Sequence, residues 1–278
     1  MAIKIKVGER EYDPDLLYQF DLSGNEDGLV EFDPVNVKVK LSGDDLVVKA
    51  FARYNLDLID ASSNTITVTG SATVQDCEVV LKRHSHLPSY INALQFLCMF
   101  YIEAASFIDV ADEKWMLYSL HNHKTDEILG FATVYRFFKF PEGIRARISQ
   151  FMVMPGWKRR GYGALMYSLL MKDLEKDPQV VQVTVESPGD AFQRMKIKCD
   201  SRMIDMRLLN DIDRSTAMDY LDVKASSGTL QIQEITMKRI RKRLAREHEE
   251  DLPVDDKQRR REILDRLVQD EIDYLRSI

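Results

Sequence analysis

One short loop in this sequence combines two glycines with three cations. Glycines let a chain turn tightly, so that successive backbone N–H groups point into one concave spot, and the dipole of a following helix adds positive potential there. Such a spot binds phosphate groups. The third glycine of a dinucleotide fingerprint and the Gly-Lys-Ser/Thr of a Walker loop are both missing, and a basic surface turn that caps a helix is the alternative interpretation. The loop comprises Lys158, Arg159, Arg160, Gly161, Tyr162, Gly163 and Ala164.

The flanking residues predict the elements that position this loop. Residues 145–154 are rich in apolar and β-branched side chains and predict a strand, which Pro155 and Gly156 end. Leucines spaced three to five residues apart predict a helix from Ala164 up to Asp177-Pro178. Residues 180–185 then predict a second strand. A helix of this length fits a crossover between two parallel strands.

The remaining chain predicts a β-rich region, a central core and a helical end. Residues 1–88 alternate as in an antiparallel β-domain, with a turn at 42–45. Residues 89–110 predict a helix that is apolar on most sides, and 114–120 and 129–140 predict two strands joined by a polar turn that holds His121 and His123. A short helix is expected over 190–198. Residues 225–228 predict a linker, followed by two amphipathic helices within 229–278. We therefore expect domains at 1–88, 89–224 and 225–278.

Composition limits the class of protein. The net charge is −6, and residues 1–88 alone hold 15 acidic against 9 basic side chains, which suits a basic partner better than direct binding to nucleic acid. The three cysteines are too few and too far apart for a disulfide framework or a metal site. No apolar run reaches the ~18 residues of a membrane span, and no secretory signal is visible. We expect an intracellular protein without metal or membrane contact.

The loop and several other segments resemble known acetyltransferases. Residues 158–164 are similar to the acetyl-CoA pyrophosphate loop of the GNAT family, with Lys158 in place of the usual Arg or Gln. Phe107-Ile108-Asp109, Phe131-Ala-Thr-Val-Tyr135 and Ser149-Gln150 resemble the catalytic subunit of type B histone acetyltransferases. The resemblance is clear from about residue 94 to 188. It implies an α+β fold: a GNAT core, whose mixed sheet has splayed parallel strands flanked by helices, with an N-terminal β-rich domain and a C-terminal helical segment.

The resemblance also implies roles for particular residues. Acetyl-CoA would be held by the loop and by the backbone of Phe151, Met152 and Val153. Glu186, at the end of the second parallel strand, stands at the position of the general base, and Glu103 would be a supporting carboxylate. The substrate lysine arrives mostly as an ammonium ion and needs such a base. Glu186 as an ordinary strand-end carboxylate is the alternative.

The family further implies a substrate and partners. The substrate would be lysines in the N-terminal tail of free, newly synthesised histone H4, together with histone H3, and a WD40-repeat histone chaperone would be the partner, in the nucleus and the cytoplasm. The implied tail-contact residues also have ordinary structural interpretations, namely a turn, a core anchor and ordinary strand aromatics. Those residues are Asn25, Glu26, Asp27, Trp115, Tyr135, Arg136 and Phe137.

Two residues depart from the family pattern. Ser187 replaces an aspartate just after the base, and Phe192 replaces a tyrosine. These departures leave two rival hypotheses: an acetyltransferase for another protein or a small amine, and a non-catalytic histone-binding subunit.

Overall fold

The structure is a computed structural model in which the strands before Gly70 are described by their backbone alone. The ranges it describes are 2–7, 10–12, 29–32, 37–42, 45–50, 66–74, 77–88, 91–102, 105–141, 143–226, 232–253 and 255–278. The chain divides into two compact units, residues 1–180 with 184–187, and residues 181–183 with 188–278. No helix within these ranges combines the length and apolarity that crossing a membrane requires.

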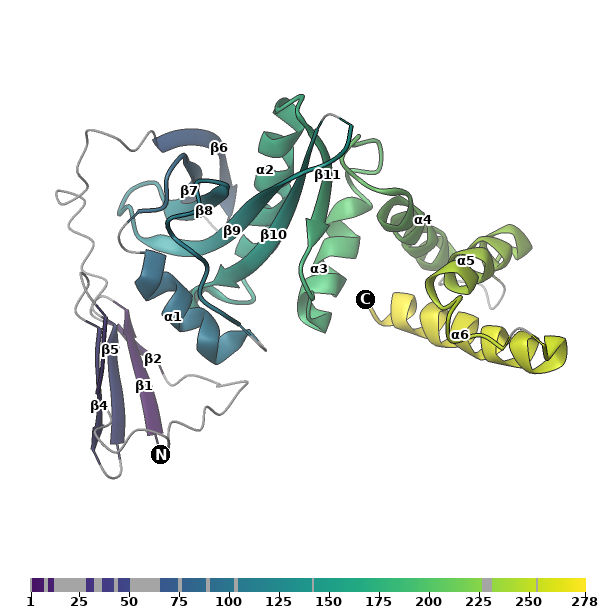
Figure 1. Cartoon of the computed structure of the whole chain (residues 1–278), viewed down its shortest axis with the longest axis horizontal. Helices are drawn as coiled ribbons and strands as arrows, with labels where there is room; N and C mark the ends of the chain where they lie inside the picture. Colours follow the sequence, from purple (N-terminus) through teal and green to yellow (C-terminus); the bar gives the residue numbers. More distant parts are fainter. Residues whose placement is uncertain are drawn as a thin grey trace. The chain divides into compact units, whose positions relative to one another are not determined.

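The centre of the first unit is a six-stranded sheet in the order β11-β10-β9-β8-β7-β6 (Figure 1). Strands that follow one another in the chain are neighbours, and the pairs from β6 to β10 are antiparallel. The sheet includes two strands that precede residue 88. The strands are β6 (Ile66–Val74), β7 (Cys77–His84), β8 (Trp115–Asn122), β9 (Ile128–Phe138), β10 (Ile144–Val153) and β11 (Val180–Val185).

The pair β10–β11 is parallel and separates partway along its length. The N–H of Ile144 donates to Gln179 O at 2.7 Å, and the N–H of Glu186 donates to Ile148 O at 2.9 Å. Because the paired positions rise along both strands together, the strands run in the same direction. The strand β11 ends at Val185, whereas β10 continues past Ile148 to Val153. The mixed sheet with a splayed parallel pair is thus confirmed.

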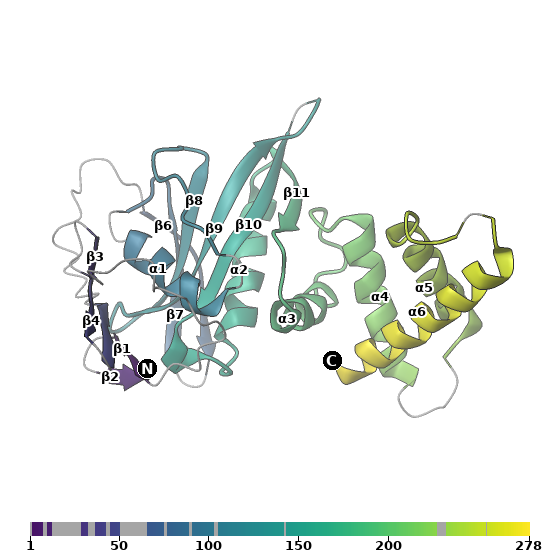
Figure 2. The ribbon, with the colours of Figure 1, turned by 60° about the horizontal axis from the view of Figure 1, so that its bottom comes forward.

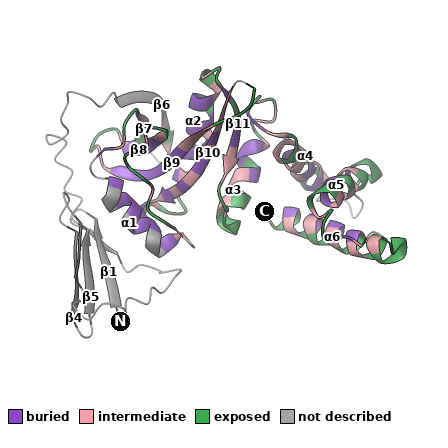
Figure 3. Ribbon diagram, in the orientation of Figure 1, coloured by how far each residue is buried: buried purple, intermediate pink, exposed green. Residues whose placement is uncertain are grey.

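Two helices cover opposite faces of this sheet (Figure 2). Gln95 of α1 (Ile91–Tyr101) contacts Gln150 on one face, and Asp173 of α2 (Tyr162–Lys176) accepts a hydrogen bond from Tyr118 on the other. Central strand β8 is buried at six consecutive positions because both of its faces are covered, while β10 alternates between buried and half-buried residues (Figure 3). The core therefore lies on both sides of β8 and β9.

The helix α1 is shorter than expected from the sequence. It ends at Tyr101, whereas the apolar pattern predicted a helix to residue 110. Residues 105–109 are irregular: the N–H of Ala105 donates to Ile102 O at 3.2 Å, whereas the N–H of Ile108 donates to the side-chain oxygen Gln95 Oε1. A side-chain acceptor thus takes the place of a helical carbonyl at Ile108.

A second, five-stranded sheet of the same unit has the order β2-β1-β5-β4-β3. The predicted turn at 42–45 joins β4 to β5 in an antiparallel hairpin. In contrast, β1 and β5 pair in parallel, which the alternating sequence did not predict. The strands are β1 (Ala2–Val7), β2 (Arg10–Tyr12), β3 (Leu29–Phe32), β4 (Val37–Ser42) and β5 (Asp45–Ala50).

The second unit contains four helices. The expected helices at 190–198 and within 229–278 are α3 (Asp190–Asp200), α5 (Glu234–Glu247) and α6 (Lys257–Ser277). Its α4 (Asp211–Ala225) was missed in the sequence, because its buried face consists of Ala217, Asp219 and Val223 rather than large apolar residues. Ile240, Leu244, Val268 and Ile272 form one of its apolar clusters. Ile235, in the first turn of α5, is exposed.

Candidate active site

The basic loop lies between the end of β10 and the start of α2. After a 3-10 turn at Pro155–Trp157, Arg159 and Gly161 adopt φ values of 61° and 88°. A Cβ at Gly161 would lie 3.8 Å from Val74 Cγ1, so space is available and the left-handed backbone is what requires glycine. The helix α2 begins at Tyr162, and Gly161, its N-cap residue, has no side chain to cap the first turn. This is the geometry expected of an anion-binding helix N-terminus.

Aromatic rings hold two of the loop cations. The Nζ of Lys158 lies 3.6 Å from the centroid of the Tyr101 ring, and Cζ of Arg160 lies 5.2 Å from that of Trp157. The indole N–H of Trp157 in turn donates to Glu127 Oε1 at 3.2 Å. Both cations remain exposed, so the rings fix the path of the loop and leave its positive charge at the surface.

Tyr162 anchors the loop to the sheet. Its side chain is buried, and its ring packs edge-on against Trp157 at 5.7 Å between centroids. Burial raises the pKa of Tyr162, and a hydrogen bond with the thiol of Cys77 acts in the same direction. The Tyr162 phenol is therefore neutral and serves to pack the loop. Toward a phosphate, Tyr162 contributes its position in the first turn of α2.

Glu186 lies where β11 ends and the parallel strands separate. Its backbone N–H is bonded to β10, and its exposed carboxylate accepts a hydrogen bond from Ser149 Oγ at 2.6 Å. The next residue, Ser187, has φ of 37°, a conformation that side-chain-bearing residues rarely adopt and that clusters at functional sites. The contact between Ser149 and Glu186 was not predicted from the sequence.

A β-bulge in β10 sets the position of Ser149. Ile148 pairs with Val134 and Phe151 with Ala132, so two residues, Ser149 and Gln150, lie opposite the single Thr133. Bulges of this kind re-aim side chains next to active sites.

The predicted cofactor contacts on β10 follow this bulge. Phe151, Met152 and Val153 lie beyond the point where β11 ends, with Met152 buried between half-buried neighbours. A Cβ at Gly130 of β9 would come within 2.8 Å of Met152 O, so the two backbones approach closely only because residue 130 is glycine. This stretch of β10 is thus placed for backbone contacts to an extended ligand.

Three of the predicted substrate contacts form one aromatic group. Trp115 and Phe137 flank Tyr135, with ring centroids 4.8 Å and 4.5 Å from the Tyr135 ring. The Tyr135 hydroxyl donates to Asp112 Oδ2 at 2.8 Å, and this hydrogen bond raises the pKa of Tyr135. The backbone N–H of Lys114 lowers the pKa of Asp112, which keeps it an acceptor.

This aromatic group lies close to Glu186 across the sheet. Tyr135 pairs with Arg147, the residue before Ile148, to which Glu186 is bonded. Two strand spacings therefore separate Tyr135 from Glu186, or roughly 10 Å between their backbones. Arg145 and Arg147 both stack on the Phe137 ring, and this places two positive charges beside the aromatic group.

Other predicted residues are not brought to this group. Arg136 alternates to the α2 face, where both of its terminal nitrogens lie 3.1 Å from Asp177 Oδ2. Glu103 and the loop Asn25, Glu26 and Asp27 lie outside the residues that the structure describes. His121, predicted in a turn, is instead buried in β8, while His123 does lie in the turn.

A buried network of amide side chains beside the bulge was also missed. Gln150 Nε2 donates to Ser106 O at 3.0 Å and to Gln95 Oε1 at 3.4 Å, and the Gln150 backbone N–H donates to Thr133 Oγ1 at 3.0 Å. Gln95 and Gln150 are 1% and 4% exposed. The signal in the sequence that could have indicated this network was Gln95, a glutamine at a core position of an otherwise apolar helix.

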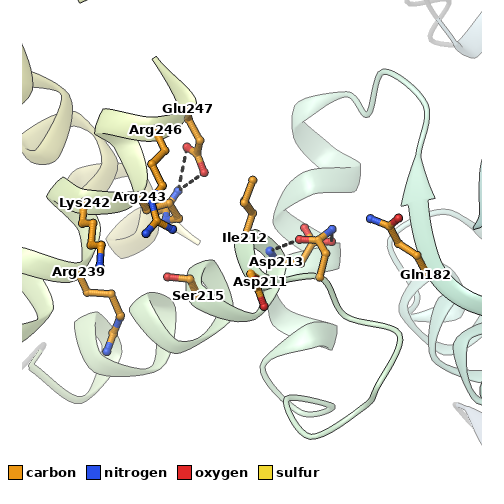
Figure 4. A pocket seen from close by; sticks show the side chains of 11 residues that line it. Gln182, Asp211, Ile212, Asp213, Ser215, Arg239, Lys242, Arg243, Arg246 and Glu247 are labelled. Carbon is orange, nitrogen blue, oxygen red and sulfur yellow. Dashed lines mark hydrogen bonds and ion pairs between the residues drawn. The ribbon is translucent and has the colours of Figure 1, made fainter. Parts of the chain in front are cut away.

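The helical unit has a hollow of its own, with a volume of about 640 Å³ (Figure 4). It lies between the first turn of α4 and the basic side of α5. Much of its charge is internally paired: Arg243 contacts Glu247 and Glu271, Arg239 contacts Asp219, and Asp213 contacts Lys196. Across the described residues of the chain, no three His, Cys, Asp or Glu side chains gather in a way that could hold a metal ion.

Comparison with known proteins agrees with this geometry. Residues 83–195 match the acetyltransferase (GNAT) family. A histone acetyltransferase type B catalytic subunit from Schizosaccharomyces pombe is 35% identical over 127 residues, which cover 43% of this chain and 34% of the relative. One from Kluyveromyces lactis is 31% identical over 155 residues, covering 50% and 40%. The matches thus span well under half of these relatives' length.

Among the solved structures that are similar to this chain is Arabidopsis thaliana NAA60 in complex with a bisubstrate analogue. The match has a TM-score of 0.36 and 13% identity, and it covers 42% of this chain and 82% of that chain. The family match spans the splayed strands, the glycine loop and Glu186. Residues 83–195 are therefore similar to the GNAT acetyltransferase family, and they are related in sequence to the catalytic subunits of type B histone acetyltransferases.

Proposed function

We propose that this protein transfers the acetyl group of acetyl-CoA to lysine side chains in the N-terminal tail of free, newly synthesised histone H4. The observation that carries the proposal is the placement of Glu186, held by Ser149 at the point where β10 and β11 separate. Its GNAT domain and its type B relatives support the choice of acyl donor and of substrate class.

The residues present fit acetyl-CoA. The uncapped N-terminus of α2 and the cations of residues 158–160 suit its pyrophosphate, and the end of β10 suits its extended arm. When bound, acetyl-CoA supplies an activated thioester. The chain supplies the remaining functions: the loop binds, β10 orients, and Glu186 accepts a proton.

Glu186 is the proposed general base. A lysine has a pKa of about 10.4 in water, so it arrives protonated and must lose a proton before its nitrogen attacks. The Ser149 hydroxyl donates to Glu186 Oε2, which leaves Oε1 to receive that proton. An acyl-cysteine route through Cys98 or Cys199 is disfavoured, because both are buried and burial raises the pKa of the Cys98 thiol.

The aromatic group is the proposed binding site of the histone tail. Trp115, Tyr135 and Phe137 share the face that carries Arg147, roughly 10 Å from Glu186 across the sheet. We further propose that Glu103 and residues 25–27 contribute carboxylates to a basic tail, that histone H3 accompanies H4, that a WD40-repeat chaperone binds the complex, and that the protein works in the nucleus and cytoplasm.

A non-catalytic histone-binding subunit is the second candidate, favoured by Ser187 and Phe192 at positions where the family has an aspartate and a tyrosine. The two functions are separated by incubating the full chain with acetyl-CoA and an H4 tail peptide, beside spermidine as a small amine. We expect acetylated peptide and little acetyl-spermidine. Peptide binding without product would favour the binding subunit, and preferential acetylation of spermidine would favour a small-amine acetyltransferase.

A further inference from the structure

The bulge in β10 is held by side chains rather than by the strand ladder. Because Ser149 and Gln150 face one residue, the ladder is interrupted there, and Thr133 Oγ1 accepts the Gln150 N–H at 3.0 Å in place of a backbone carbonyl. The Thr133 side chain is fully buried. Buried N–H groups need a partner, so the hydroxyl of Thr133 stabilises the bulged register against the regular one.

The Gln150 side chain joins this bulge to the segment 105–112. Its amide donates to Ser106 O at 3.0 Å and to Gln95 Oε1 at 3.4 Å, and Gln95 Oε1 also accepts the N–H of Ile108 at 2.6 Å. One amide pair therefore holds two backbone groups of an irregular segment. Polar networks that are buried and satisfied in this way select one arrangement of the groups they join.

The two ends of this network reach the two halves of the candidate site. Ser149, next to Gln150, donates to the Glu186 carboxylate, and Asp112, in the tethered segment, accepts from the Tyr135 hydroxyl. Gln150 is thus connected to the proposed base through Ser149 and to the proposed tail-binding aromatics through segment 105–112, and it belongs to neither group.

We propose that Gln150, with Gln95 and Thr133, is a positioning residue for acetyl transfer: it fixes the β10 bulge and segment 105–112 together, so that Ser149 meets Glu186 while Asp112 meets Tyr135. This inference deepens the proposed function and rests on it. It assigns the network no contact with acetyl-CoA or the lysine, and it predicts effects on the peptide side of the reaction.

The test compares Gln150→Met with Tyr118→Phe in the full chain. Methionine keeps the length of the side chain and loses the amide. Tyr118→Phe is the control, since it removes a buried side-chain hydrogen bond elsewhere, to Asp173 on the opposite face of the sheet, whereas Gln150→Met removes the bonds to Ser106 O and Gln95 Oε1. Thr133→Val and Thr133→Ser form a second pair, in which serine keeps the hydroxyl. Each variant is assayed for steady-state acetylation of an H4 tail peptide and for hydrogen exchange of residues 105–114.

We expect Gln150→Met and Thr133→Val to raise the KM for the peptide and to lower kcat, each by about fivefold, with the KM for acetyl-CoA changed less than twofold. Exchange over 105–114 should rise in Gln150→Met and stay unchanged in Tyr118→Phe, and Thr133→Ser should restore activity. If Gln150→Met matches Tyr118→Phe in every readout, the network is merely structural and the proposal is wrong. If wild type acetylates no substrate, the proposed function has failed, and exchange alone then decides whether the network tethers the segment.

Discussion

The hydrogen bond from Ser149 to Glu186 gives the sharpest quantitative prediction. Ser149→Ala removes a donor that lies 2.6 Å from Glu186 Oε2 and leaves the carboxylate in place. Hydrogen bonds to charged groups contribute about 1.5–3 kcal/mol when buried, but Glu186 is exposed and water replaces much of this, so we assign about 1 kcal/mol. That value corresponds to a fall of about fivefold in kcat/KM for the peptide.

Ser149 is expected to act only through Glu186. Glu186→Gln should lower kcat about 100-fold or more, the usual contribution of a general base. Once the carboxylate is gone, the serine has no base to orient, so Ser149→Ala in the Glu186→Gln background should cost less than twofold. Ser149→Thr, which keeps the hydroxyl, should stay near wild type. A full fivefold loss from Ser149→Ala in the Glu186→Gln background would refute the assignment.

Three further predictions concern the loop and the two buried polar groups. Gly161→Ala should lower stability by about 1 kcal/mol in thermal melts and raise the KM for acetyl-CoA, because residue 161 has φ of 88°. Gly189→Ala, at φ of −69° and with no atom within 4 Å of the new Cβ, should leave the KM for acetyl-CoA unchanged. His84, 2% exposed, has its pKa lowered to about 4 by burial, with the charges of His121 and Lys82 adding to the effect. Between pH 6.5 and 4, His84 binds a proton in the unfolded chain but not in the folded one, so the free energy of unfolding should fall by about 3 kcal/mol as the pH drops. The measurement is urea titration of wild type and of His84→Gln across this pH range. The same pH dependence in both proteins would contradict the prediction. Asp219→Asn should lower the free energy of unfolding of the helical unit by about 3 kcal/mol, because Asp219 is fully buried between Arg239 and Arg243. Asp222→Asn should lower it by less than about 1 kcal/mol, because Asp222 is half-exposed against Arg239. Equal losses in thermal melts of the two variants would show that burial is not the cause.

The elements around the loop could be predicted because local chemistry determines them. Pro155 ends a strand, Gly161 supplies a left-handed turn, and the leucines of α2 mark its buried face, so sequence spacing carries the necessary information. Here short-range patterns and the final fold agree. Glu186 was assigned from the resemblance to the GNAT family, because its place at the end of β11 alone would equally fit an ordinary strand-end carboxylate.

Other parts depend on contacts between distant residues. The buried face of α4 centres on Asp219, whose partners Arg239 and Arg243 lie on another helix, so no apolar stripe reveals it. Beyond the end of α1, Gln95 holds the Ile108 backbone, and in β10 a bulge opposite Thr133 sets the position of Ser149. The strand over residues 129–140 was predicted from the sequence, yet the face on which Arg136 lies was not, because its partner Asp177 follows a different element.

The most direct test of the proposed function is acetyl transfer from acetyl-CoA to a histone H4 tail peptide by the full chain, followed by mass spectrometry, with wild type beside Glu186→Gln. The change is nearly isosteric, and the amide oxygen can still accept the hydrogen bond from Ser149. We expect acetylated lysine with wild type and a loss of about 100-fold in the variant. Equal rates in the two proteins would show that Glu186 is not the base, and no product from either would contradict the proposed activity itself.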